Sequence, residues 1–97
     1  MTEPPAVTLR LPAVLADLVD GRRSITVSPA PATVAELLDA VETDHPVVVR
    51  RIRDETGALR RFVNVYVDGD DVRHVDGLAT ALPAGAVVHV LPSVAGG

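Results

Sequence analysis

The sequence predicts an α+β fold, in which a mixed sheet of four to five strands has one main helix packed across it. Several short runs alternate apolar and polar residues, which is the pattern of half-buried strands. One longer run instead places its apolar residues at helical spacing. Because 97 residues match the usual length of one domain, we expect all of these elements to share a single core.

Two strands are expected near the N-terminus. Residues 6–11 alternate, and Pro12 ends the run because proline cannot donate to a strand ladder. Residues 23–27 form a second run that could pair with the first as an antiparallel hairpin. Residues 13–19, between them, are ambiguous, because their apolar side chains have helical spacing but Gly21 limits the segment to about two turns.

The main helix is expected between Thr33 and Pro46. Thr33 followed by Glu36 is a capping-box signature, in which the two side chains satisfy free amides of the first helical turn. Residues 47–54 fit either a second, short helix or an irregular return. The apolar stripe of the main helix consists of Val34, Leu37, Leu38 and Val41.

The strongest strand pattern covers residues 61–67. Three valines point to one face of this strand, and Phe62, Asn64 and Tyr66 point to the other. The dipeptide Asp68-Gly69 that follows is a strong signal for a two-residue hairpin turn. We therefore expect a short return strand directly after it.

The last strand is expected over residues 86–91, where Pro92 stops it. Its valines need burial beneath the helix, so the strand is most naturally central and parallel to the first. The order strand, strand, helix, strand, short strand, strand is that of a β-grasp, ubiquitin-like domain. We assign residues 1–92 to this domain and residues 93–97 to a flexible tail that ends in Gly-Gly.

Composition excludes several classes of function. Aromatic residues make up 2% of the chain and the net charge is −4, which argues against a nucleic-acid partner. Cysteine is absent, so the chain has no disulfide, thiolate nucleophile or thiolate metal ligand. The sequence has neither a secretory signal nor an apolar run that could span a membrane, and we expect a cytoplasmic protein. All nine basic residues are arginine, so the chain has no lysine to accept an isopeptide bond.

The terminal pair Gly96-Gly97 suits enzymatic activation of a carboxylate. Glycine lacks a Cβ atom, so these residues can pass through a narrow channel and adopt backbone angles closed to other residues. Adenylation by ATP would turn the poorly electrophilic carboxylate of Gly97 into a mixed anhydride, which a sulfur or nitrogen nucleophile can attack. In this interpretation Gly96, Ala95 and Val94 provide the passage to the partner's active site.

Short motifs in the C-terminal part of the chain resemble a known family, and the likeness is specific from Arg61 to Gly97. Together they look like the MoaD/ThiS sulfur-carrier family, with the nearest likeness to an actinobacterial carrier in a thiocarboxylate route to cysteine. The motifs are RFVNVYV at 61–67, DGDDVR at 68–73, GLAT at 77–80, Gly85, and VLPSVAGG at 90–97.

The resemblance implies a carrier with no catalytic activity and no bound cofactor of its own. An E1-like enzyme of the MoeB/ThiF type would adenylate Gly97, using ATP and Mg, and convert it to a thiocarboxylate. A sulfur-accepting synthase, of the cysteine, thiazole, molybdopterin or thiosugar type, would then take the sulfur. In the cysteine route, a metalloprotease would release the amino acid from Gly97.

Two other functions fit the same features. The chain could be a ubiquitin-like modifier joined through Gly97 to lysines of other proteins, or a β-grasp interaction module whose terminal glycines are incidental. Loss of function on deletion of Gly96 and Gly97 would distinguish both covalent functions from the module.

A docking surface for a partner is expected on the strand over residues 61–67. The candidate residues are Phe62, Asn64 and Tyr66, together with Arg60 and Arg61. An alternative places Phe62 under the segment that follows the main helix. The five arginines between positions 50 and 61 fit either a solvated edge paired with Asp54 and Glu55 or a patch that docks an acidic partner.

No metal site is expected. His45, His74 and His89 lack the close spacing of a ligand set. Asp68, Asp70 and Asp71 cluster at the predicted hairpin but lack the distal glutamate of a calcium loop, so a solvated turn is the better interpretation.

Overall fold

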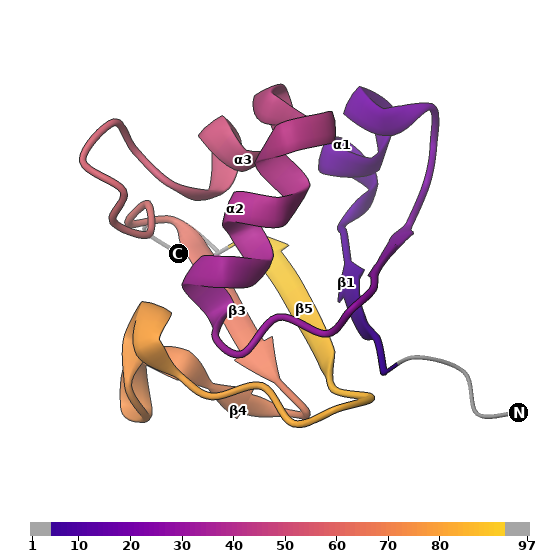
Figure 1. The fold of residues 1–97 in the computed structure, drawn as a ribbon. Coiled ribbons are helices and arrows are strands. Elements are labelled where there is room, and N and C mark those ends of the chain that lie inside the picture. Colours follow the sequence, from indigo (N-terminus) through magenta and orange to yellow (C-terminus); the bar gives the residue numbers. More distant parts are fainter. Residues whose placement is uncertain (1–4, 93–97) are drawn as a thin grey trace, which may run out of the picture.

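The computed structural model describes residues 5–92 and forms two layers. A five-stranded sheet in the order β2-β1-β5-β3-β4 has the helices over one of its faces (Figure 1). This confirms the predicted β-grasp fold. The strands are β1 (Val7–Arg10), β2 (Ser24–Val27), β3 (Val63–Val67), β4 (Asp70–Asp71) and β5 (Val87–Pro92). The α-helices are α1 (Ala13–Ala16), α2 (Val34–Asp44) and α3 (Pro46–Ile52), with 3₁₀ helices η1 (Asp17–Val19), η2 (Val72–His74) and η3 (Gly77–Ala79).

The N-terminal hairpin pairs β1 with β2 in antiparallel register, Val7 opposite Val27. The ambiguous segment between the two strands is helical, because α1 runs directly into η1. Its inner side chains, including Leu15, are buried in the core. Val14 and Leu18 are instead exposed, so only part of the predicted apolar stripe of this segment faces the sheet.

Helix α2 is capped and buried as predicted. The Thr33 side-chain oxygen accepts a hydrogen bond from the Glu36 N–H at 3.2 Å, and a Glu36 carboxylate oxygen accepts from the Ala32 N–H at 3.1 Å. Its stripe of Val34, Leu37, Leu38 and Val41 is buried.

The segment after α2 is a helix rather than an irregular return. α3 starts at Pro46, where proline suits the first helical turn because the amide it lacks would have no partner there. Val48, Val49 and Ile52 are buried in the core. Burial of these side chains explains why this short segment is helical.

Strand β5 occupies the centre of the sheet and runs parallel to β1, as predicted, and it pairs with β3 in antiparallel register. The β3–β4 turn has Asp68 and Gly69 at positive φ, 47° and 94°, which matches a two-residue hairpin. An Asp68 carboxylate oxygen also accepts a hydrogen bond from the Val87 N–H at 2.9 Å, which ties the hairpin to the start of β5.

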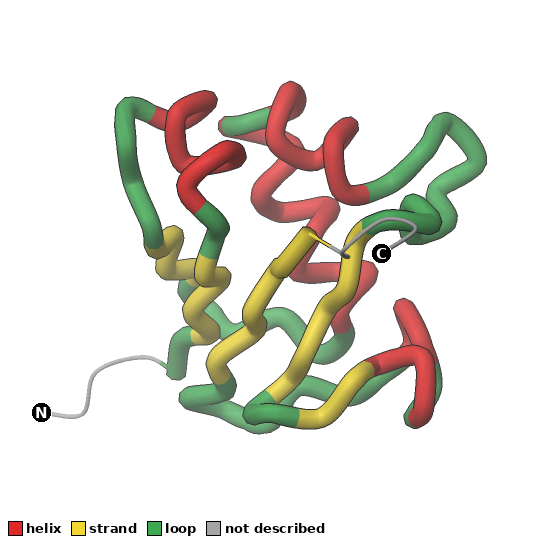
Figure 2. Tube along the Cα trace, turned by 180° about the vertical axis from the view of Figure 1, so that it is seen from behind, coloured by secondary structure: helices red, strands yellow, loops and turns green. Residues whose placement is uncertain are grey.

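The core between the sheet and the helices is aliphatic, and the other face of the sheet is not covered by helices (Figure 2). Neither aromatic residue belongs to this core: Phe62 is exposed and Tyr66 is half-buried. Among residues 5–92, no helix is long and apolar enough to cross a membrane.

Candidate functional site

The residues expected to carry the chemistry belong to the C-terminal tail. Gly97, Gly96, Ala95 and Val94 lie outside the described residues, so their roles remain predictions. The structure describes the place to which they are attached. The central strand β5 ends at Pro92, which pairs with Val63 at the start of β3. The candidate site is therefore the end of the domain around Pro92.

An apolar groove of about 380 Å³ lies at this end of the domain. One wall comes from the α1–η1 segment and the other from the ends of β3 and β5, with an arginine of α3 between them. The residues that line it include Val14, Leu18, Arg51, Val63, Val90 and Pro92.

A second, basic hollow of about 850 Å³ adjoins this groove and shares Arg51 and Val63 with it. It brings together residues of α3 and of the chain that leads into β3. The side chains that line it include Val47, Arg50, Arg51, Arg60, Arg61 and Phe62. The predicted docking residues Arg60, Arg61 and Phe62 therefore lie beside α3.

The prediction that Phe62 shares a strand face with Asn64 and Tyr66 is wrong. The strand begins at Val63 rather than at Arg61, because a Val63 N–H to Arg60 C=O hydrogen bond of 3.1 Å closes a turn around Phe62. Strand alternation therefore does not extend to Phe62. The side chain is 54% exposed and lines the hollow next to α3, as the alternative interpretation had proposed in part.

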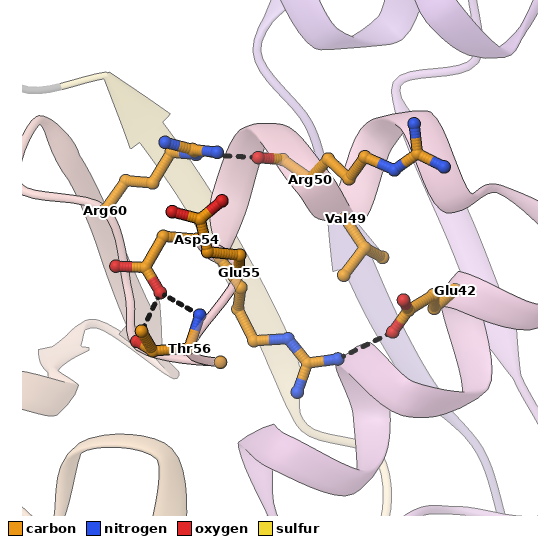
Figure 3. Close-up of a pocket in the computed structure, with 9 residues that line it drawn as sticks. Glu42, Val49, Arg50, Asp54, Glu55, Thr56 and Arg60 are labelled. Atoms are coloured by element: carbon orange, nitrogen blue, oxygen red, sulfur yellow. Dashed lines mark hydrogen bonds and ion pairs between the residues drawn. The ribbon is translucent and has the colours of Figure 1, made fainter.

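The arginines of this region differ in their partners. Figure 3 shows a further hollow, separate from the basic one, whose lining includes Glu42, Arg50, Arg53 and Arg60. Arg53, whose side chain is largely buried, pairs with Asp39 at 2.8 Å and with Glu42 at 3.0 Å. Arg60 donates through Nε to the Arg50 carbonyl oxygen at 2.6 Å. Arg53 thus joins α2 to the end of α3. Within residues 5–92 these arginines form no ion pair with Asp54 or Glu55, contrary to one of the two interpretations of the sequence.

Asp54 instead organises the loop after α3. One of its oxygens accepts hydrogen bonds from the Thr56 hydroxyl, from the Thr56 N–H at 2.8 Å and from the Ala58 N–H at 3.2 Å. The Thr56 hydroxyl hydrogen bond is the main cause that lowers the pKa of Asp54 below its ordinary value, and Arg60 adds a smaller electrostatic effect. Asp54 is therefore a structural residue of this loop.

Asn64 and Tyr66 alternate along β3 with the buried Val65 and Val67, so they lie on the face of the sheet opposite the core, next to β5. Tyr66 pairs with the exposed His89, and Asn64 accepts a hydrogen bond from Arg73 at 2.8 Å. Arg73 also donates to the Arg60 carbonyl oxygen at 3.0 Å. This face therefore carries both aromatic and polar side chains, and Asn64 is already hydrogen-bonded to Arg73.

The histidines and the acidic hairpin do not gather into a metal site within the described chain. In residues 5–92, no three His, Asp or Glu side chains meet in a way that could hold a metal ion. Asp71 accepts a hydrogen bond from the Arg73 N–H at 2.9 Å and caps η2, while Asp68 binds the start of β5. These two aspartates have structural partners in the fold.

The sequence reasoning missed the groove. Val14 and Leu18 have the i, i+4 spacing of a helical stripe, but the sequence leaves this segment ambiguous and assigns it no site. The sequence held a partial signal for exposed apolar side chains, because this short segment contains more large apolar residues than one side of a two-turn helix can bury. Their position beside Pro92 depends on the tertiary structure.

Comparison with known proteins agrees with this geometry. The model of the ThiS family matches residues 9–97. Sulfur carrier protein CysO of Mycobacterium tuberculosis is 38% identical over 93 residues, which cover 94% of this chain and 98% of the relative. The crystal structure of M. tuberculosis CysO superposes with a TM-score of 0.82 at 36% identity, covering 91% of this chain and 99% of that one.

Two further similarities are to a protein crystallised in a complex and to a modifier protein. CysO in the Amycolatopsis orientalis BexX/CysO complex has a TM-score of 0.79 at 38% identity, covering 94% of this chain and 99% of that one. Small archaeal modifier protein 3 of Haloferax volcanii is 41% identical over 66 residues, 68% of this chain and 71% of the relative.

Proposed function

Since the chain belongs to the ThiS family, we propose that it is a sulfur carrier whose Gly97 carboxylate takes up the sulfur. The observation that carries this function is the extent of the similarity. The family match runs through residue 97, and the 38% identity to a sulfur carrier protein covers 98% of that relative. The similarity therefore includes both the domain and the tail.

The chemistry proceeds in two steps at the Gly97 carboxylate. The Gly97 carboxylate attacks the α-phosphorus of ATP, which releases pyrophosphate and forms an acyl-adenylate. A sulfur nucleophile then attacks the acyl carbon and AMP leaves, so that one carboxylate oxygen is replaced by sulfur. The product is a thiocarboxylate, which is a stronger nucleophile than the carboxylate it replaces.

The domain supports this role by attaching the tail to a strand of the sheet. β5 pairs with β1 as far as His89 and with β3 as far as Pro92, which lies opposite Val63. The five residues after Pro92 span at most about 17 Å when extended. An active site that receives Gly97 must therefore come close to the end of the domain around Pro92.

In this proposal the carrier is not an enzyme, and its partners supply the catalytic groups. An E1-like enzyme of the MoeB/ThiF type activates Gly97 with ATP and Mg, and a sulfur-accepting synthase takes the sulfur. A relative crystallised as a BexX/CysO complex supports a partner bound to this kind of carrier. A metalloprotease would follow if the product is cysteine, and we place these reactions in the cytoplasm.

The direct test is the intact mass of the protein after incubation with ATP, Mg, an E1-like enzyme and a sulfide source. We expect a mass increase equal to the replacement of one oxygen atom by one sulfur atom, located at Gly97 by fragmentation. A variant lacking Gly96 and Gly97 but with the same melting temperature should show no such increase. An unchanged mass and no ATP–pyrophosphate exchange for the full chain would refute the function.

Conjugation to proteins is the second candidate, because the chain is also 41% identical to a small archaeal modifier protein over 66 residues. Here a lysine amine of a target protein would attack the same adenylate. The discriminating measurement is an immunoblot of native cells for adducts of higher mass, followed by peptide mapping of a Gly97–lysine isopeptide bond. Thiocarboxylate without adducts would favour the carrier function alone.

A further inference from the structure

The groove beside Pro92 presents apolar surface that the described chain does not cover. Val14 and Leu18 lie one helical turn apart on one wall and are 68% and 41% exposed. Val63, Val90 and Pro92 form the opposite wall. On a small domain, exposed apolar side chains that gather in one hollow are typical of an interaction site, because apolar side chains that contact no partner are usually buried in the core. The groove therefore offers apolar surface at the end of the domain where the tail is attached.

Arginines border this apolar groove on the side of α3. Arg51 lines both the groove and the adjoining basic hollow, and Arg61 lies in the same hollow next to the exposed Phe62 and Val47. Apolar and basic side chains therefore form one continuous surface from the α1–η1 segment to the start of β3. We call this surface, defined by Val14, Leu18, Arg51, Arg61, Phe62 and Val63, the tail-base surface.

The arginines of the tail-base surface are available for a partner. Within residues 5–92, the ion pairs are those of Arg53 with Asp39 and Glu42, which lie outside this surface. Arg51 and Arg61 have no ion pair in that part of the chain. Asp54 also lines the basic hollow, but its single carboxylate stands against four arginines there, Arg50, Arg51, Arg60 and Arg61. The chain as a whole carries −4, so this positive patch contrasts with the rest of the molecule. That contrast would turn the tail-base surface toward an acidic surface of a partner.

We propose that the tail-base surface docks the E1-like enzyme that activates Gly97, through an apolar side chain of that enzyme flanked by carboxylates. The apolar side chain enters the groove, and the carboxylates pair with Arg51 and Arg61. The inference rests on the proposed function, because the short tail requires any enzyme that binds Gly97 to approach Pro92. Docking at this surface aligns the tail with the active site before chemistry occurs.

The test uses the full chain and the E1-like activating enzyme of the same organism as the probe. The basic variant is Arg51→Glu with Arg61→Glu, and the apolar variant is Val14→Ser with Leu18→Ser. We expect each to raise the KM for the carrier in ATP–pyrophosphate exchange about tenfold with little change in kcat. For the wild type, KM should also increase with salt, and the basic variant should lose this dependence.

Matched controls separate the surface from general effects of charge and polarity. Arg10→Glu with Arg22→Glu makes the same change in net charge at two exposed arginines that do not line the groove or the hollow. Val75→Ser removes an exposed valine elsewhere on the molecule. All variants should keep the wild-type melting curve, and these controls should keep the wild-type KM.

A second readout measures docking without chemistry. Amide resonances of the ¹⁵N-labelled chain, titrated with the enzyme in the absence of ATP, should shift around Val14, Leu18 and Phe62. Shifts confined to the uncovered sheet face around Tyr66 and His89, or a KM that rises in the arginine control rather than in the basic variant, would overturn the inference.

The two readouts also separate this inference from the proposed function. Docking at the tail-base surface without any thiocarboxylate would refute the function and retain the docking surface. Normal thiocarboxylate formation with an unchanged KM in both variants would retain the function and refute the docking surface.

Discussion

Replacement of Leu38 by aspartate should unfold the domain. Leu38 lies in the middle of α2 and is 1% exposed, packed in the aliphatic core. Truncation of a buried leucine to alanine by itself costs about 2–5 kcal/mol. An unpaired carboxylate in the same place adds a desolvation cost of several kcal/mol. The sum, roughly 5–10 kcal/mol, is comparable with the roughly 5–15 kcal/mol that stabilises a domain of this size.

Urea denaturation followed by far-UV circular dichroism measures this effect, since the chain has no tryptophan for fluorescence. Leu38→Ala serves as the graded variant, because it leaves a cavity without a charge. A loss of about 3 kcal/mol with a slope near 1.5 kcal/mol per molar urea lowers the midpoint by about 2 M. Leu38→Asp should show no cooperative transition.

The matched control introduces the same carboxylate on the exposed side of the same helix. Ala40 is exposed, so Ala40→Asp costs only the lower helix propensity and the unfavourable interaction with the helix dipole, at most about 1 kcal/mol. A folded Leu38→Asp protein with a midpoint near that of Ala40→Asp would refute the burial of Leu38 and the placement of α2 over the sheet.

Three further predictions concern local structure. Thr33→Ala removes the oxygen that accepts a hydrogen bond from the Glu36 N–H, so the free energy of unfolding measured in urea should fall by about 1 kcal/mol. Thr43→Ala, near the exposed end of α2, should lower it less, and equal losses in the two variants would contradict the cap. Gly69→Ala should lower the same free energy by about 1 kcal/mol because Gly69 has a φ of 94°, and an unchanged urea midpoint would contradict that turn geometry. Asp54 has a lowered pKa, so its hydrogen bonds stabilise the fold above the ordinary value of 3.8 and lose this effect as the pH falls below it. Asp54→Asn should therefore be less stable than the wild type at neutral pH and approach it in acid, and a pH-independent difference would refute this.

The elements that the sequence predicted well are those with complete local signals. Helix α2 has both its cap, Thr33 with Glu36, and its full apolar stripe within one short segment. The β3–β4 turn was predictable because Asp68-Gly69 favours the positive φ angles that such a turn needs. The central place of β5 followed from burial, since a strand with Val88 and Val90 both fully buried needs cover.

The sequence did not predict the ends of elements, because these depend on contacts with distant residues. Phe62 continues the alternation of β3 in the sequence, but the turn closed by Arg60 and Val63 removes it from the strand and places it beside α3. Arg53 was expected to pair with neighbouring acidic residues. It pairs instead with Asp39 and Glu42, because packing brings α2 and the end of α3 together.

By itself, the sequence determined the fold class and the order of the strands along the chain, because these depend on periodicity and on residue type. The surface around Pro92, to which the terminal residues are attached, was decided only by the tertiary structure. Val14, Arg51 and Val63 are distant in sequence and meet because α1, α3 and β3 pack at the same end of the sheet as Pro92. The spacing of apolar residues along the chain indicates which side chains can be buried together. The packing of the elements in three dimensions decides which of these side chains remain exposed and which residues they lie beside.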